Sequence, residues 1–107
     1  MITLPISEIT SQSDSSEELL VQGVIDCFFF DSEGKVWLVD YKTDHFPKNT
    51  PENEVENELI RRHKEQMYYY RLALGRLCGR EVSYTRIYSF HLGRSVSLDE
   101  IERKDLL

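Results

Sequence analysis

Cysteine is scarce in this sequence. Its 107 residues include two cysteines, Cys27 and Cys78, and neither belongs to a C-x-x-C pair. Structural zinc and iron–sulfur sites need several ligands at short spacings, and disulfide scaffolds need more cysteine than this. We therefore expect two reduced thiols in the core of a cytoplasmic protein.

Extended apolar stretches and an excess of basic charge are missing as well. No stretch approaches the ~18 apolar residues that span a membrane, and the N-terminus does not resemble a signal peptide. The formal net charge is −6, whereas a free-standing nucleic-acid-binding domain usually has a basic excess. A local basic patch or a larger parent protein could still supply the positive field.

The composition is that of a folded chain. Hydrophobic residues make up 40%, charged residues 30% and aromatic residues 11% of the sequence, which argues against disorder. The length is enough for a single domain over residues 1–107 with a small core. Apolar residues begin almost at once, which suggests that Met1 is not the natural start of the domain.

The first half of the chain has the pattern of strands. Alternating apolar residues predict a short strand within residues 1–10, and a polar loop follows at 11–18. Residues 19–30 are apolar on both faces, as in a central strand. A turn at 31–34 should return the chain into a strand at 35–43, so that these two strands form an antiparallel hairpin.

A long helix follows a loop at residues 44–50. Thr50 is the predicted N-cap and Pro51 the first helical residue. Apolar side chains then recur at spacings of three and four as far as Leu77, and Gly79 is the predicted C-cap.

Two more strands are predicted after the helix. Residues 82–92 alternate between apolar and polar side chains, Gly93 begins a turn, and 95–98 form a short last strand. A short helical or loose tail ends the chain. The order of elements predicts an α/β fold, with a mixed, mainly antiparallel sheet flanked by one long helix.

Two charges interrupt the apolar strand at residues 35–43. Asp40 and Lys42 are two residues apart and therefore point to the same face. Buried charges need a partner or a metal, so this pair is either an ion pair at a strand end or a metal-ligand Asp beside a catalytic Lys. Pairing across the hairpin, with one bulge, would bring Asp26 close to Asp40.

The helix carries polar residues that could face these charges. Gln66 and Tyr70 are four residues apart and share one side of the helix, as functional groups or as the polar tips of an ordinary helix face. His63 is more typical of a histidine at the edge of a core than of a ligand. His45 and His91 have no partner at ligand spacing.

These residue types suit the hydrolysis of a phosphodiester. Two neighbouring carboxylates, Asp26 and Asp40, can hold Mg²⁺, which acidifies bound water and stabilises charge on a phosphate. A lysine such as Lys42 can orient that water or neutralise the phosphate.

Three motifs occur in the order found in a known nuclease family. Gly23–Asp26, Asp40–Thr43 and Gln66–Tyr70 resemble the motif series of the RecB-like nucleases in the PD-(D/E)XK superfamily. With Leu38–Asp44 and Tyr88–Arg94, the chain is most similar to the C-terminal nuclease domains of the AddA family, subunits of bacterial AddAB (RexAB) helicase-nuclease complexes.

The resemblance implies a restriction-endonuclease-like core and roles for individual residues. Asp26, Asp40 and the backbone carbonyl of Tyr41 would coordinate Mg²⁺ or Mn²⁺, and Lys42 would be the catalytic lysine. The implied activity is exonucleolytic cleavage of DNA.

The resemblance also implies supporting residues and partners. Gln66 and Tyr70 would support the site and contact DNA. Helicase domains of a parent chain and a second subunit of the AddB/RexB type would cooperate in ATP-dependent processing of double-strand breaks for recombinational repair.

The chain departs from the family at one point. Family members have an upstream helix with a metal-ligating His, and no His precedes Asp26 here. The expectation is therefore an N-terminally truncated domain with weak activity by itself. Two alternatives stay open: a catalytically inactive nuclease-fold module that binds DNA or acts as a scaffold, and an α/β interaction domain in which Asp40 and Lys42 form an ordinary ion pair.

Overall fold

The computed structural model describes residues 4–11, 18–25 and 27–106. In the described part of the chain the elements are β1 (Leu4–Ser11), β2 (Glu18–Ile25), β3 (Cys27–Phe30), β4 (Val36–Lys42), α1 (Glu52–Cys78), β5 (Val82–Ser89), β6 (Arg94–Ser97) and the 3₁₀ helix η1 (Arg103–Leu106).

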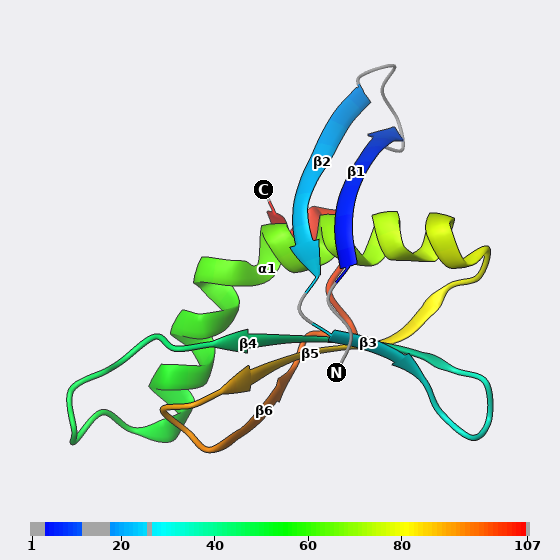
Figure 1. The fold of residues 1–107 in the computed structure, drawn as a ribbon. Helices are drawn as coiled ribbons and strands as arrows, with labels where there is room; N and C mark the ends of the chain where they lie inside the picture. Colours follow the sequence, from blue (N-terminus) through cyan, green and yellow to red (C-terminus); the bar gives the residue numbers. More distant parts are fainter. Residues whose placement is uncertain (1–3, 12–17, 26, 107) are drawn as a thin grey trace.

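The strands form two separate sheets. The larger has the order β3-β4-β5-β6, in which β4 and β5 are parallel and the other neighbours antiparallel; β1 and β2 form an antiparallel ribbon. Helix α1 lies along the four-stranded sheet, and the β1–β2 ribbon crosses the helix and projects outward (Figure 1). The predicted α/β class, with a mixed sheet and one long helix, is confirmed.

The predicted strand at residues 19–30 is wrong in one respect, because it is divided between the two sheets. β2 pairs with β1, whereas β3 pairs with β4 through partners such as Cys27 and Val39. The predicted hairpin is confirmed for β3 and β4. β3 is an edge strand and not a central one, and it is apolar on both faces because Phe28 packs against the core while Phe29 stacks on Trp37.

The turn between β3 and β4 is confirmed and has a clear cause. The Asp31 carboxylate accepts hydrogen bonds from the backbone N–H groups of Glu33, at 2.9 Å, and Lys35, at 3.0 Å. Gly34 has a φ of 79°, which a residue without a side chain adopts freely. Local hydrogen bonding therefore fixes the register of the hairpin.

Helix α1 is confirmed over nearly its predicted length. It begins at Glu52, so the N-cap position is Pro51, and the prediction of Thr50 as N-cap is wrong by one residue. The reason is that the Pro51 carbonyl already accepts the first backbone bonds of the helix. Gly79 is the C-cap as predicted, with a left-handed φ of 68°.

The strand predicted at residues 82–92 is too long. β5 ends at Ser89, whose hydroxyl accepts a hydrogen bond from the backbone N–H of Leu92 at 3.1 Å. The chain then turns through Gly93, with a φ of 68°, into β6. The hydrogen bond between the Ser89 hydroxyl and the backbone of Leu92 favours a turn over continued strand pairing. The alternation of apolar and polar residues continues through this turn, so it predicted a longer strand.

The hydrophobic core lies between the four-stranded sheet and α1. Alternate residues of β4 face α1, and Val36 and Leu38 are fully buried there. The main cluster joins the sheet, the helix, the ribbon and the segment after β6, and consists of Ile6, Val36, Leu38, Met67, Tyr70, Ala73, Leu74, Ile87 and Leu98. In the described ranges, no helix is both long and apolar enough to cross a membrane.

Candidate functional site

The candidate site begins where the buried face of β4 becomes charged. Val36, Leu38 and Asp40 alternate along the strand toward α1, and Asp40 is 4% exposed. Lys42 follows on the same face as the last residue of the strand. A carboxylate therefore lies at the end of an apolar row, where an uncompensated charge would be costly.

A continuous series of polar contacts connects β4 to α1. The Lys42 ammonium lies 2.8 Å from the Asp40 carboxylate and donates a hydrogen bond of 2.9 Å to the Gln66 side-chain carbonyl. The Gln66 amide nitrogen donates in turn to the Tyr70 hydroxyl at 3.4 Å. Four of the five side chains predicted from the sequence are thus brought together: Asp40, Lys42, Gln66 and Tyr70.

The pair formed by Asp40 and Lys42 is shielded from solvent. The Lys42 side chain is 17% exposed and the Asp40 side chain 5% exposed. Such a pair is weak evidence for added stability, yet removal of one partner takes an opposite charge away from a poorly solvated group, which is destabilising. The contact with Gln66 also fixes the orientation of the amide, because an ammonium can only donate.

The site lies at the carboxyl ends of two parallel strands, a place where α/β sheets commonly bind ligands. β4 and β5 are parallel, with Asp40 beside Ile87 and Lys42 beside Ser89. The backbone N–H of Phe90 donates to the Lys42 carbonyl at 3.2 Å, just past the end of β5. Ligands of open α/β sheets bind outside the carboxyl ends of parallel strands, which is where Lys42 lies.

Two predicted metal ligands are not tested by these contacts. Asp26 lies outside the described residues, although its neighbour Cys27 pairs with Val39, the residue before Asp40. The Tyr41 ring lies on the opposite sheet face, with its centroid 6.0 Å from that of Tyr88, and the role of its carbonyl stays a prediction.

The donor chemistry is compatible with a hard cation, since carboxylate and carbonyl oxygens are the ligands that Mg²⁺ prefers. Among the residues that the structure describes, no three His, Cys, Asp or Glu side chains converge on one point. The predicted second carboxylate, Asp26, lies outside that set.

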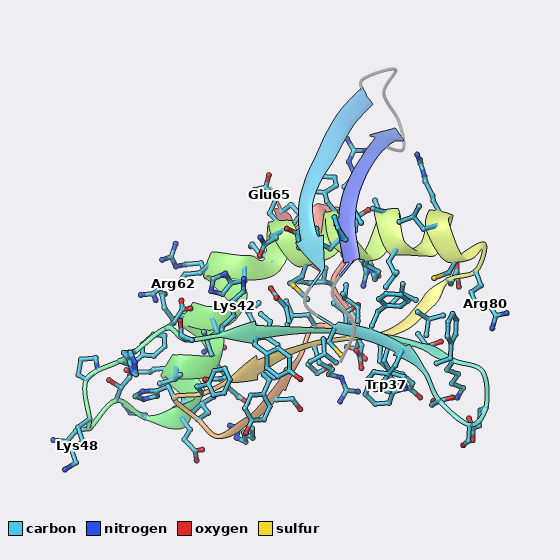
Figure 2. The ribbon with its side chains drawn as sticks, viewed as in Figure 1. Trp37, Lys42, Lys48, Arg62, Glu65 and Arg80 are labelled. Carbon is cyan, nitrogen blue, oxygen red and sulfur yellow. The ribbon has the colours of Figure 1, made fainter. Side chains whose placement is uncertain are left out.

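A second polar cluster adjoins the first. Asp44 accepts hydrogen bonds from the His63 ring nitrogen Nε2 and from the Arg62 guanidinium, both at 3.0 Å. Lys42 and Arg62 lie on the same side of the molecule, near the place where β4 and α1 cross (Figure 2). Lys48 lies far out in the loop that connects β4 to α1. Arg62 also contacts Glu58 at 3.0 Å.

These contacts settle the charge of Asp44 and the proton position on His63. Burial by itself would raise the pKa of Asp44, but hydrogen bonds from His63 and Arg62 outweigh it and hold the pKa below its usual value. The carboxylate is therefore ionised near neutral pH. Because it can only accept, the His63 proton that faces it must be on Nε2.

The sequence interpretation missed this second cluster. His63 was expected at the edge of the core, and its side chain is indeed 18% exposed, but its partner Asp44 was not foreseen. A signal was available, since Asp44 continues the spacing of Asp40 and Lys42, and His63 lies one helical turn before Gln66. His45 and His91 have ring centroids 6.5 Å apart and stay outside both clusters.

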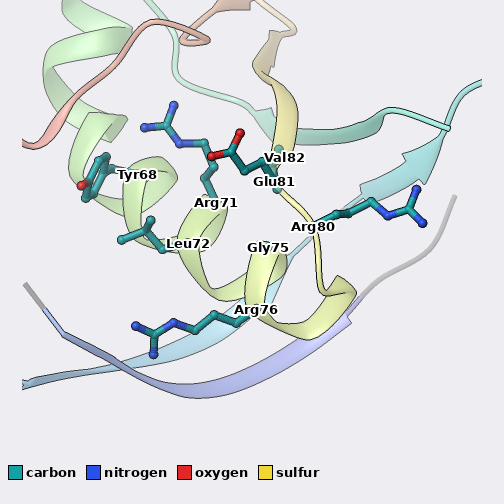
Figure 3. Close-up of a pocket in the computed structure, with 8 residues that line it drawn as sticks. All are labelled: Tyr68, Arg71, Leu72, Gly75, Arg76, Arg80, Glu81 and Val82. Carbon is teal, nitrogen blue, oxygen red and sulfur yellow. The ribbon is translucent and has the colours of Figure 1, made fainter. Parts of the chain in front are cut away.

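An open hollow of about 610 Å³ occupies another side of α1 (Figure 3). Its lining contains none of the predicted site residues and consists of Tyr68, Arg71, Leu72, Gly75, Arg76, Arg80, Glu81 and Val82. We place the candidate site at Lys42 and not in this hollow, because buried, paired charges concentrate at the former.

Comparison with known proteins points to one group of relatives. The chain is 36% identical over 102 residues to the AddA subunit of an ATP-dependent helicase/nuclease from Clostridium botulinum strain Okra, and 31% identical over 96 residues to its namesake from Clostridium beijerinckii. These alignments cover 92% and 90% of this chain but 7% of each relative's length. No family model matches the chain. The chain is therefore similar to a small part of the AddA subunits of helicase/nucleases.

Proposed function

We propose that this chain is a RecB-like nuclease unit of the PD-(D/E)XK type, which hydrolyses phosphodiester bonds of DNA as an exonuclease. The observation that carries the proposal is the connected series Asp40–Lys42–Gln66–Tyr70 at the carboxyl end of β4. An ordinary strand-end ion pair would not need a buried carboxylate and an amide and phenol from a second element. Similarity to subunits named helicase/nuclease supports the same activity.

Each residue has a defined part in this proposal. Asp26, Asp40 and the Tyr41 carbonyl would hold Mg²⁺ or Mn²⁺, and the bound ion would acidify a water molecule and supply positive charge at the phosphate. Lys42 has three donors, of which contacts among the described residues use two, for Asp40 and Gln66. We assign the remaining donor to a phosphate oxygen or to the attacking water.

Gln66 and Tyr70 position the lysine. The Gln66 carbonyl accepts a hydrogen bond from the ammonium, and the Tyr70 hydroxyl accepts one from the Gln66 amide nitrogen. Tyr70 is 7% exposed and packs in the main core, so the series rests on a rigid element. Gln66 is exposed and is the member best placed to contact DNA as well.

The setting of the activity is part of the proposal. The relatives are named as subunits of an ATP-dependent helicase/nuclease, so we place this chain's activity within an ATP-dependent helicase-nuclease that processes double-strand breaks for recombinational repair. Helicase domains and a second subunit of the AddB/RexB type would deliver DNA. A chain with a net charge of −6 would then not need to attract DNA by itself.

Metal titration and DNA degradation test the proposal together. We expect the purified protein to bind Mn²⁺ in a calorimetric titration and to degrade linear DNA, weakly by itself, when Mg²⁺ or Mn²⁺ is present. Asp40→Asn should weaken Mn²⁺ binding by more than the ~10- to 100-fold that loss of an outer-shell partner costs. Lys42→Ala should reduce hydrolysis by ~10²- to 10³-fold, as loss of one transition-state donor does, and leave Mn²⁺ binding in place.

Lys48→Ala is the matched control, because Lys48 is an exposed lysine in the loop that follows the same strand. Unchanged hydrolysis in Asp40→Asn and Lys42→Ala would contradict the proposal. DNA binding without Mn²⁺ binding or hydrolysis would instead identify an inactive nuclease-fold module.

A further inference from the structure

The second polar cluster joins the same two elements as the first. Lys42 of β4 contacts Gln66 of α1, and Asp44, two residues later, contacts His63, one helical turn earlier. The two contacts therefore form successive cross-links between the end of β4 and one side of the helix. Both pair a charged group from the strand end with a polar group from the helix.

The position of the Lys42 ammonium needs such support. Lys42 is the last residue of β4, and residues 43–51 contain no helix or strand. A lysine side chain also has substantial rotamer freedom of its own. A strand end followed by a loop can shift relative to the helix that supplies the acceptor unless a further contact fixes the spacing.

We propose that Asp44 and His63 are positioning residues that hold Lys42 at its contact with Gln66. The expected effect on catalysis rests on the proposed nuclease function. The positioning itself concerns only contacts between side chains of this chain. Asp44 is well suited to the task because one of its oxygens accepts from two donors, His63 and Arg62. A carboxylate with two donors on α1 cannot leave the helix without losing both.

Neighbouring contacts make the attachment rigid. The Arg62 guanidinium lies 5.0 Å from the ring centroid of Phe46, two residues after Asp44. Phe46 packs in turn against the buried cluster of Val55, Leu59 and Val96. The segment that follows Lys42 is thus fixed to α1 by an ion pair, a hydrogen bond and an apolar contact, and His63 is the least exposed of its polar helix partners.

Substitution of His63 tests the proposal with two readouts. The first is the Gln66 side-chain amide resonance in ¹⁵N-labelled protein, assigned by its loss in Gln66→Glu. The second is steady-state hydrolysis of linear DNA. His63→Ala should move the Gln66 resonance and lower kcat by up to ~100-fold, the loss that a displacement of about 1 Å can cause, with KM for DNA nearly unchanged.

Two variants separate positioning from a general effect on the fold. His63→Gln keeps an N–H donor for Asp44 and should restore most of kcat and the Gln66 resonance. Arg61→Ala removes a side chain from a neighbouring helical position that contacts Glu58, and it should change neither readout. If His63→Ala does not fold, Asp44→Ala gives the same readouts, because it removes the group that accepts hydrogen bonds from His63 and Arg62.

The outcomes are distinct. An unmoved Gln66 resonance in a folded His63→Ala protein overturns the proposal, and so does a raised KM with unchanged kcat, which would indicate a contact with DNA. If the wild-type protein does not hydrolyse DNA, the proposed function fails, and the Gln66 resonance still confirms or refutes the positioning role.

Discussion

Asp40 and Lys42 show how a small apolar core accommodates charge. The two groups lie 2.8 Å apart, and the Asp40 side chain is 5% exposed. Loss of either group removes an opposite charge from the other in a poorly solvated place, which is costly. Variants at these positions should therefore be compared at a temperature where each is shown to be folded, so that lost hydrolysis is not confused with lost structure.

Asp99 is a second carboxylate with an organising role, at the segment after β6. It accepts hydrogen bonds from the backbone N–H of Thr85 at 2.6 Å and from the Arg86 guanidinium at 2.7 Å. We expect Asp99→Asn to lower the free energy of unfolding by about 1–2 kcal/mol, the usual scale for hydrogen bonds to a charged group that is partly exposed. Urea denaturation followed by circular dichroism measures this loss.

The same substitution has a defined pH dependence. Burial would raise the pKa of Asp99, but hydrogen bonds from Arg86 and Thr85 hold it below its usual value. The folded state thus binds the proton less readily than the unfolded state. The stabilisation is complete above about pH 4 and is lost as the pH falls through the folded-state pKa. The difference between wild type and Asp99→Asn should therefore shrink in acid.

Glu100→Gln is the control for Asp99→Asn, because the neighbouring Glu100 is exposed. It should change stability by less than about 0.5 kcal/mol. A difference between wild type and Asp99→Asn that grows in acid would contradict the assigned direction of the pKa shift.

Helix α1 was the element best predicted from sequence, and physical reasons explain this. A helix of 27 residues repeats its apolar spacing many times, and Gly79 marks its end. The contacts among Asp40, Lys42, Gln66 and Tyr70 were also foreseeable, because spacings of two on a strand and four on a helix determine which side chains share a face. Whether these residues act as proposed stays a prediction.

Features that depend on tertiary arrangement could not be predicted. The run from Leu19 to Phe30 contains one acid, Asp26, between the last residue of β2 and the first residue of β3. A single acid does not by itself indicate a change of sheet, and both strands otherwise use the same residue types. The contact between Asp44 and His63 depends on the path of an irregular loop, which sequence periodicity does not describe.

The C-terminus of α1 provides a prediction for an element. Gly79 has a φ of 68°, and a Cβ added there would meet no atom within 4 Å. Gly79→Ala should therefore cost roughly 1–2 kcal/mol through backbone strain, without a steric clash. Gly79→Asn should cost less, because asparagine adopts the left-handed region more readily. Thermal denaturation compares the two, and equal losses would contradict the assignment to strain.

The four-stranded sheet has two faces of different character. One packs on α1 through fully buried residues such as Leu38 and Ile87. The other carries aromatic rings in contact, with Trp37 between Phe29, at a centroid distance of 5.6 Å, and Tyr84, at 4.1 Å. The Trp37 indole also donates to Asp31 at 2.9 Å. Trp37 is the single tryptophan of the chain, so its fluorescence reports on the sheet during unfolding.

Two leucines on α1 test whether one core holds these parts together. Leu74 is fully buried in the cluster that also contains Ile6 of β1 and Leu98 after β6, whereas Leu77 is 54% exposed on the same helix. Leu74→Ala should lower the free energy of unfolding by about 2–5 kcal/mol, because it removes buried methyl groups and leaves a cavity. Leu77→Ala should change it by less than about 0.5 kcal/mol.

The probe of unfolding matters for this comparison. If a single core joins the sheet, helix and ribbon, Trp37 fluorescence and circular dichroism should give the same transition midpoint in wild type and in Leu74→Ala, since a small cooperative unit unfolds in one step. Separate transitions in Leu74→Ala would mean that the sheet and the helix no longer unfold as one unit. The contact between Lys42 of the sheet and Gln66 of the helix would then not be maintained by a core that the two elements share.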